Sequence, residues 1–285
     1  MSAPAQSRVV FQTGAALLAF ALNSILCRAA LASGAIDATS FTGVRLASGA
    51  LVLLALERWT RGGAGRTRLA GDWLSAAALF AYALAFSLAY GALSAGTGAL
   101  ILFGCVQATM LGAGLRAGER PDARLWVGLA LALGGLAWLV APGLAAPPAG
   151  GAALMAAAGV AWGIYSLRGR RAADPVASTA GNFARAAPLA LIALAGAWSD
   201  AHADAFGLAL ALVSGAITSG LGYVVWYAAL RGLSASGAAL VQLGVPVVTA
   251  LLGVTFLAER ATLRLVLAAT LVLGGIALAV ARRGR

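Results

Sequence analysis

The chain has 285 residues, of which 61% are hydrophobic and only 10% are charged, and its mean hydropathy is +0.92. Soluble domains carry about 25% charged residues, so this composition excludes a soluble enzyme or binding domain. The formal net charge of +11 comes from 20 basic residues, all of them arginines, that lie mainly at the ends of apolar blocks. This placement is typical of membrane helices and argues against a nucleic-acid partner, which needs one continuous basic surface.

Charged and turn-forming residues divide the chain into ten apolar segments, each of about the 20 residues that a helix needs to cross a bilayer. In chain order, these segments cover residues 9–31, 39–59, 71–91, 94–115, 123–141, 149–169, 176–198, 205–230, 236–257 and 261–281. Pro142, Pro147 and Pro148 follow the fifth segment, and the glycine-rich residues 62–65 follow the second. We therefore predict an all-α integral membrane protein with ten transmembrane helices.

The distribution of arginines among the connections predicts which way these helices run. With the N-terminus inside, fifteen arginines fall on the cytoplasmic side, whereas only Arg260 and Arg264 fall on the opposite side. Arg28, Arg45 and Arg185 remain at membrane depth. Because positive charge is retained on the cytoplasmic side, we expect a multi-pass protein of the bacterial inner membrane with both termini in the cytoplasm.

The second half of the sequence repeats the first half at an offset of 140 residues. The offset aligns Arg28 with Arg168, Arg45 with Arg185, Gly104 with Gly244, and Glu119-Arg120 with Glu259-Arg260. We therefore divide the chain into a five-helix unit over 1–143 and a second five-helix unit over 144–285. An odd number of helices makes the second unit an inverted repeat of the first. Inverted repeats build many transporters, with a binding site near the middle of the membrane.

Two stretches of the sequence resemble motifs of a known transporter family. The run from Gly159 to Ser166 (GVAWGIYS), followed by two arginines, resembles the sixth-helix motif of the drug/metabolite transporter superfamily, specifically its ten-helix EamA-type exporters. The stretch from Ala238 to Pro246, followed by residues 256–260, is similar to the ninth helix of that family. Arg45 and Asn23 match polar residues of its second and first helices.

The resemblance covers the whole chain and is greatest to the aromatic amino acid exporters. It implies ten helices and the export of small solutes. In one respect the sequence departs from the family, because many members carry proline in the fourth helix, where this chain has Val106. That departure puts in doubt whether both halves bend equally.

No arrangement of residues in the sequence indicates catalysis, a cofactor or a metal. A nucleophile–histidine pairing and a phosphate-binding loop are both absent, and the single histidine, His202, lies between Asp200 and Asp204 in a connection. That pattern favours a solvated turn over a metal site. All nine carboxylates fall in connections or at helix ends. Because buried carboxylates mark cation and proton sites in membranes, their absence at mid-depth predicts an essentially uncharged binding site and no enzyme activity.

Neutral polar and aromatic side chains at mid-depth are the candidates for substrate binding. They are Asn23, Tyr82, Phe86, Phe103, Gln107, Trp162, Tyr165, Tyr223, Trp226 and Gln242. Amides are costly against lipid, so the asparagine and the two glutamines should face protein or water. The alternative is that the rings anchor helices at the membrane surface and the polar groups join helices to one another.

Three further residue types allow two interpretations each. Arg45 and Arg185 could bind a substrate carboxylate, but we favour structural pairing near a helix end. Glu119 and Glu259 are expected to cap or pair locally. Pro246 should kink its helix and is predicted to act as a hinge, the alternative being a static kink.

Taken as a whole, the sequence predicts an exporter of amino acids, aromatic and other neutral ones, or of similar metabolites, working by alternating access. The alternatives are a broad-specificity drug exporter and a non-transporting membrane scaffold subunit. The expected partners are a small-molecule substrate and the lipid bilayer. The oligomeric state stays open. The many small residues, such as the Gly159/Gly163 pair, suit packing within one chain and are compatible with a monomer.

Overall fold

The computed structural model describes residues 3–60, 70–116, 123–141, 143, 146–170, 172–230, 233 and 241–280. The first half contains α1 (Ala3–Ala32), α2 (Ala38–Thr60), α3 (Trp73–Tyr90), α4 (Ala95–Arg116) and α5 (Ala123–Val140). The second half contains α6 (Ala149–Gly169), α7 (Pro175–Gly196), the short η1 (Trp198–Asp200), α8 (Ala205–Val213), η2 (Ser214–Leu221), α9 (Gly222–Leu230), α11 (Gly244–Leu257) and α12 (Leu263–Val280).

The described helices confirm the predicted all-α architecture. Because α8, η2 and α9 follow one another without a break over Ala205–Leu230, the described residues form ten helical rods. Their bounds agree with the predicted segments to within about two residues, except that α1 begins six residues earlier and α11 starts at Gly244. Residues 236–240 of the predicted ninth helix, and the glycine-rich residues 62–65, lie outside the described residues.

Length and hydropathy make this a multi-pass membrane protein. Within the described residues, six helical rods are long and apolar enough to cross a membrane, namely α1, α2, α3, α4, α6 and the α8–η2–α9 rod. Shorter apolar stretches occur in α5, α11 and α12. The remaining helix, α7, carries Arg185 and Asn182 within its span.

Acidic residues fix where several helices begin. The side chain of Asp72 accepts a hydrogen bond from the backbone N–H of Ser75 and caps α3. Asp174 caps α7 in the same way, with Pro175 at the first helical position, and Asp204 caps α8. Capping satisfies N–H groups that have no partner inside the helix, and a negative charge there is also favoured by the helix dipole.

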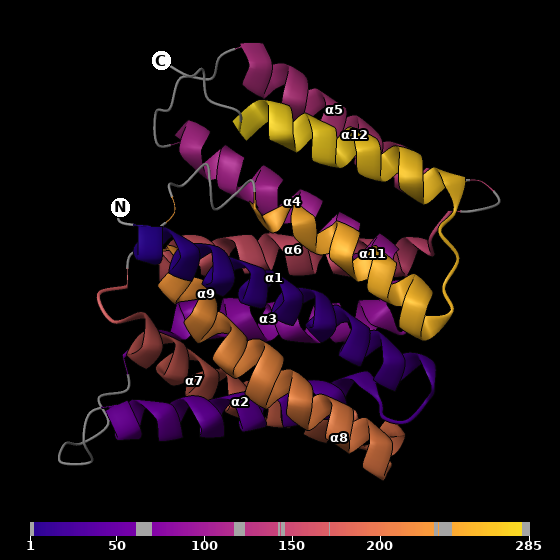
Figure 1. Cartoon of the computed structure of the whole chain (residues 1–285). Coiled ribbons are helices and arrows are strands. Elements are labelled where there is room, and N and C mark those ends of the chain that lie inside the picture. The colour runs from indigo at the N-terminus through magenta and orange to yellow at the C-terminus, as the bar shows by residue number, and fades with distance from the viewer. Residues whose placement is uncertain are drawn as a thin grey trace.

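The helices of the two halves interleave in one bundle. In Figure 1, α1 begins and α12 ends at the same end of the bundle, which we call the terminal end, and α1 finishes at the opposite, far end. Close packing joins α5 to α12, α2 to α7, and α4 to α11. In addition, α3 packs on α6, while α8, η2 and α9 pack on α1.

Glycines allow α6 to approach α4 within this bundle. A Cβ on Gly159 would lie 2.5 Å from the carbonyl oxygen of Leu102, and one on Gly163 would lie 2.8 Å from Thr109. The predicted use of this glycine pair for packing within one chain is therefore confirmed.

Two irregularities interrupt the helices of the second half. The chain turns at Leu243, just before α11, and Pro246 is the third residue of that helix. Proline has no N–H to donate to the carbonyl of Gln242, which accounts for the break, while the kink and the hinge motion stay predictions. The second irregularity is η2, a π-helical stretch that the sequence did not indicate.

Candidate functional site

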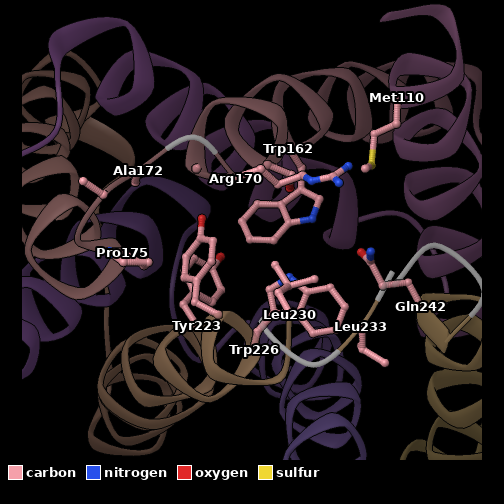
Figure 2. Close-up of a pocket in the computed structure, with 14 residues that line it drawn as sticks. Met110, Trp162, Arg170, Ala172, Pro175, Tyr223, Trp226, Leu230, Leu233 and Gln242 are labelled. Atoms are coloured by element: carbon pink, nitrogen blue, oxygen red, sulfur yellow. The ribbon is translucent and has the colours of Figure 1, made fainter. Parts of the chain in front are cut away.

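A cavity of about 340 Å³ opens at the terminal end of the bundle. Its walls come from the end of α6, the start of α7, the end of α9 and the residues that precede α11. Figure 2 shows the Trp162 indole in the middle of this cavity, with Tyr223 on one side and Gln242 on the other. The residues that line the cavity are Met110, Trp162, Ser166, Gly169, Arg170, Ala172, Ala173, Pro175, Tyr223, Trp226, Tyr227, Leu230, Leu233 and Gln242.

Behind Trp162 lies a much smaller chamber, which we call the inner chamber. Its volume is about 10 Å³, close to the space that one water molecule needs. Trp162 and Tyr223 line both spaces, so they form the wall between them. The residues that line the inner chamber are Phe20, Asn23, Ser24, Tyr82, Phe86, Leu102, Phe103, Trp162 and Tyr223.

The wall between the two spaces is an aromatic cluster centred on Trp162. The ring of Trp162 lies 4.9 Å from that of Tyr82 and 4.9 Å from that of Tyr223. Phe20 meets Trp162 at 6.0 Å and Trp226 at 5.8 Å, both edge to face. Tilted and edge-to-face contacts at these distances are favourable, so the rings hold one another in place around the cavity.

Hydroxyl groups of η2 form a polar floor beside the inner chamber. The amide oxygen Oδ1 of Asn23 accepts hydrogen bonds from Ser214 at 2.7 Å, Thr218 at 3.1 Å and, more weakly, Ser219 at 3.4 Å. Gly215 lets η2 press against α2, because a Cβ there would overlap the backbone carbonyl of Arg45. A π-helical turn often marks a functional position in a helix, and here it presents three hydroxyls to one amide.

Arg45 lies next to this floor and is 1% exposed. Its Nε donates a hydrogen bond to Ser219 Oγ at 2.9 Å, and its Nη2 donates one to the Tyr82 hydroxyl at 3.1 Å. The sequence favoured pairing near a helix end and an uncharged site. The contacts of Arg45 agree with structural pairing, because both partners are hydroxyls of the chain, and the uncharged binding site stays a prediction.

Comparisons with known proteins find similarity to one transporter family. Residues 149–281 match the EamA-like transporter family. Over 276 residues, 97% of this chain and 96% of the relative, the sequence is 54% identical to a Pseudomonas aeruginosa protein described as "Uncharacterized protein PA1977". The second half of the chain is therefore similar to EamA-like transporters. A solved crystal structure shares the fold, with a TM-score of 0.69 and 21% identity over 95% of this chain and 96% of that one.

The match of residues 149–281 to a transporter family indicates a membrane transporter of small solutes. The resemblance to EamA-type exporters in the drug/metabolite transporter superfamily is thereby confirmed at the level of the family. The narrower likeness to aromatic amino acid exporters stays a prediction.

At the far end of the bundle, one carboxylate joins several helices. Glu259 accepts a hydrogen bond from Arg28 Nε at 3.3 Å, and both of its oxygens accept the backbone N–H of Ala95, at 3.0 and 2.8 Å. Arg28 also donates to the backbone carbonyl of Tyr90 at 2.9 Å. These bonds join α1 and the chain after α11 to the facing ends of α3 and α4. The expectation that Glu259 pairs only locally is therefore wrong, and Glu119 lies outside the described residues.

A second latch closes the far end between α2 and α8. The backbone N–H of Asp37 donates to the carbonyl of His202 at 3.1 Å, and the carboxylate of Asp37 accepts the N–H of His202 at 2.9 Å. Partial burial disfavours the ionised form of Asp37, but hydrogen bonds from Ser40 and Thr39 outweigh it and lower the pKa of this carboxyl to about 2. The charged carboxylate is thus the form that holds the latch.

Polar contacts at the terminal end lie on one side of the cavity mouth. Arg168, at the end of α6, donates to Asp72 and Ser75 at the start of α3, both at 2.9 Å. Arg185 of α7 donates to the backbone carbonyls of Ala70 and Gly181. These bonds tie α3, α6 and α7 to one another.

Most of the predicted substrate-binding residues gather at the two spaces. Trp162, Tyr223, Trp226 and Gln242 line the large cavity, and Asn23, Tyr82, Phe86 and Phe103 line the inner chamber. Two lie elsewhere. Tyr165 is buried behind Trp162, with ring centroids 5.5 Å apart, and Gln107 lines a small separate pocket against α5 and α12. The binding roles of all ten stay predictions.

Sequence reasoning missed several wall residues. Phe20 lies three positions before Asn23, on the same face of α1, and that spacing could have identified it. Met110 is an ordinary apolar residue in the sequence and carried no such signal. The hydroxyls of Ser214, Thr218 and Ser219 converge on one amide in the structure, but the sequence does not reveal the π-helical turn that brings them there.

Proposed function

We propose that this transporter exports amino acids, aromatic and other neutral ones, or similar metabolites, by alternating access. The observation that supports this most strongly is the cavity of about 340 Å³, open at one end of the bundle and walled by rings and an amide, while the Glu259 contacts close the other end. A space that is apolar with a few placed polar groups suits a small solute with a hydrophobic side chain.

Alternating access requires two halves that can exchange roles, and the packing supports such a relation. Helices that the 140-residue offset aligns pack against each other as pairs, α2 with α7, α4 with α11, and α5 with α12. The directions of the aligned helices also support an inverted relation between the two halves. α1 begins at the terminal end (Figure 1), whereas α6, its aligned helix, finishes there beside the cavity mouth. We propose that the units 1–143 and 144–285 are inverted repeats.

The orientation that we propose places the terminal end in the cytoplasm. Arg8, Arg58, Arg116, Arg168 and Arg170 lie near helix ends on that side, and the positive-inside rule applies to such connections. The cavity then opens inward, toward the cytoplasmic pool of solutes. The localisation that follows is the bacterial inner membrane.

A flux assay in proteoliposomes tests the proposal directly. Purified protein should accelerate the exit of at least one of the twenty labelled amino acids, with phenylalanine, threonine and methionine tested first, with and without a pH gradient. A cationic drug in the same assay tests broad drug export. If no amino acid or metabolite leaves faster than from empty vesicles, the proposal is wrong.

Two substitutions test whether the cavity is the site. We expect Trp162→Ala and Gln242→Ala each to reduce flux by about tenfold, because each removes one anchoring contact of about 1–2 kcal/mol. The matched control is Trp59→Ala, which removes an exposed ring at the end of α2. All three proteins should insert, and flux is compared per folded protein, because removal of the buried Trp162 ring is expected to lower stability. Unchanged flux in both cavity variants would remove these residues from the site.

A further inference from the structure

The charge of Arg45 is only partly compensated within the described protein. Its Nε and Nη2 donate to two neutral hydroxyls, whereas Nη1 is buried without a hydrogen-bond partner. No ion pair joins Arg45 to a carboxylate in the described part of the chain. A buried charge without a counter-charge is costly, and a membrane interior makes it more so.

Aromatic rings contribute to stabilising this cation but do not neutralise it. The guanidinium carbon Cζ of Arg45 lies 5.2 Å from the ring centroid of Tyr82 and 5.2 Å from that of Phe86. Such cation–π contacts are favourable, yet they leave the net charge in place. The positive charge therefore lies within one ring of the inner chamber, because Tyr82 and Phe86 both line that chamber.

Arg185, the arginine that the repeat aligns with Arg45, does not have an unpaired buried donor. Arg185 aligns with Arg45 at the 140-residue offset, but its Nη1 donates to the backbone carbonyls of Ala70 and Gly181 at 2.8 and 2.9 Å. Arg185 is half-buried and satisfied by the chain around it. Arg45 instead directs its polar contacts to Tyr82, which lines the inner chamber, and to Ser219, which bonds to the chamber residue Asn23.

We propose that Arg45 is the anchor for a carboxylate on the transported solute. The inference rests on the proposed export function and narrows it to solutes that carry a carboxylate, either zwitterionic or anionic. The inner chamber of about 10 Å³ is too small for a carboxylate in this conformation, so the solute carboxylate would reach the unused Nη1 donor once the rings of Tyr82 and Phe86 move. A charged hydrogen bond of this kind is stronger than a neutral one. The same positive charge disfavours cationic solutes, because no carboxylate offsets it.

Matched pairs of probes test this inference on the purified full-length protein. L-phenylalanine, L-methionine and L-threonine are compared with their amides, which keep the side chain and the amine but replace the carboxylate. Flux in proteoliposomes and quenching of tryptophan fluorescence are both measured. We expect the wild-type protein to prefer the acid over its amide by about tenfold or more. Equal handling of acid and amide by a protein that does transport the acid would overturn the inference.

Substitution of the arginine assigns the preference to one side chain. Arg45→Gln should reduce the acid-to-amide preference to about one, whereas the matched control Arg185→Gln should retain it. Where Arg45→Gln does not fold, Tyr82→Phe removes only a hydroxyl partner of the guanidinium and should weaken the same preference. An unchanged preference in the folded Arg45 or Tyr82 variant would overturn the assignment.

Stability without solute separates anchoring from structural pairing. Removing an uncompensated buried cation should leave the thermal midpoint of Arg45→Gln unchanged or higher, while added phenylalanine should raise the midpoint of the wild-type protein only. A lower midpoint together with intact discrimination would assign Arg45 to structure and overturn the proposal. The failure of the export proposal and the failure of the Arg45 proposal give different results. Absence of flux for every solute contradicts export, whereas flux of acid and amide at equal rates contradicts only the role of Arg45.

Discussion

The two ends of the bundle differ in what their polar contacts join. At the far end, Glu259 links α1 and the chain after α11 to the ends of α3 and α4, and the Asp37–His202 latch links α2 to α8. At the terminal end, the contacts of Arg168 and Arg185 stay among α3, α6 and α7 on one side of the mouth. Both ends therefore have polar contacts, but those at the far end join more widely separated helices.

Exposure separates the two ends as well. The Arg28–Glu259 pair has side chains that are 22% and 14% exposed, whereas the Arg168–Asp72 pair is 39% and 46% exposed. Exposed ion pairs contribute about 0–1 kcal/mol because water screens them. The Arg28–Glu259 pair at the far end is thus better shielded from water than the Arg168–Asp72 pair at the terminal end. We therefore expect mutation of the far-end pair to have the larger effect.

The largest effect is expected from Glu259→Ala. The substitution removes the partner of Arg28 and the cap of α4 together, which we estimate at about 2–3 kcal/mol, or about 30- to 150-fold in the equilibrium for opening the far end. A reporter cysteine, Ala95→Cys, measures this in a Cys105→Ser background. Ala95 is buried, so its labelling by a membrane-impermeant maleimide should rise strongly in the variant.

Two controls sharpen this result. Glu259→Gln keeps a polar side chain at the start of α4 but removes the negative charge. It should give a rate of reporter labelling between those of the wild type and Glu259→Ala. Arg168→Gln, at the terminal end, should leave the labelling of the reporter close to wild type. Equal labelling in Glu259→Ala and Arg168→Gln would mean that the two ends are not distinguished by these contacts.

A smaller effect is expected at the mouth from Gly169→Val. The hydroxyl of Tyr227 lies directly against Gly169, and a Cβ there would overlap it. Moving Tyr227 into the mouth should reduce flux by about tenfold, equivalent to about 1.4 kcal/mol. Gly150→Val on the same helix is the matched control, because a Cβ there meets no atom within 4 Å. If Gly169→Val and Gly150→Val show equal flux, the cavity mouth does not limit transport.

The smallest effect concerns the Asp37 latch at low pH. The pKa of Asp37 is lowered from 3.8 to about 2, so its contribution is complete above about pH 4 and is lost as the pH falls toward 2. After allowing for solvent screening, we estimate about 1 kcal/mol. Thermal unfolding in detergent between pH 5 and 2 measures it. Asp37→Asn should flatten the slope, because it removes the carboxylate whose hydrogen bonds with Ser40, Thr39 and His202 lower the pKa. Equal slopes in the two proteins would exclude Asp37 as the cause.

The sequence predicted the helices well because membrane helices are encoded by long local patterns. Apolar blocks and arginines at their ends set the bounds of α2 through α7 to within about two residues. Eight of the ten predicted site residues also line one of the two spaces, because aromatic and amide groups at mid-depth must face away from lipid. Local chemistry was thus sufficient for the helix bounds, while the binding roles of these residues stay predictions.

The features that escaped prediction depend on contacts between distant residues. Glu259 has partners 231 and 164 residues away, and nothing in its local sequence distinguishes such a partner from the adjacent Arg260. The π-helical turn of η2 has the same apolar and small residues as an α-helix. The environment of Arg45 was likewise decided by tertiary packing, because Gly215 and Ser219 reach it only through the approach of η2 to α2.

The buried position of Arg45 also has a consequence for how the chain is made. Its partner Ser219 is 174 residues further along, so α2 enters the bilayer during synthesis long before that hydroxyl exists. An arginine near the middle of a membrane helix costs about 2.5–3.5 kcal/mol on insertion scales. A fragment that stops after α5 retains this cost. Such a fragment keeps the Tyr82 and Phe86 contacts of Arg45 but lacks Ser219, so we expect it to insert less efficiently than the full chain.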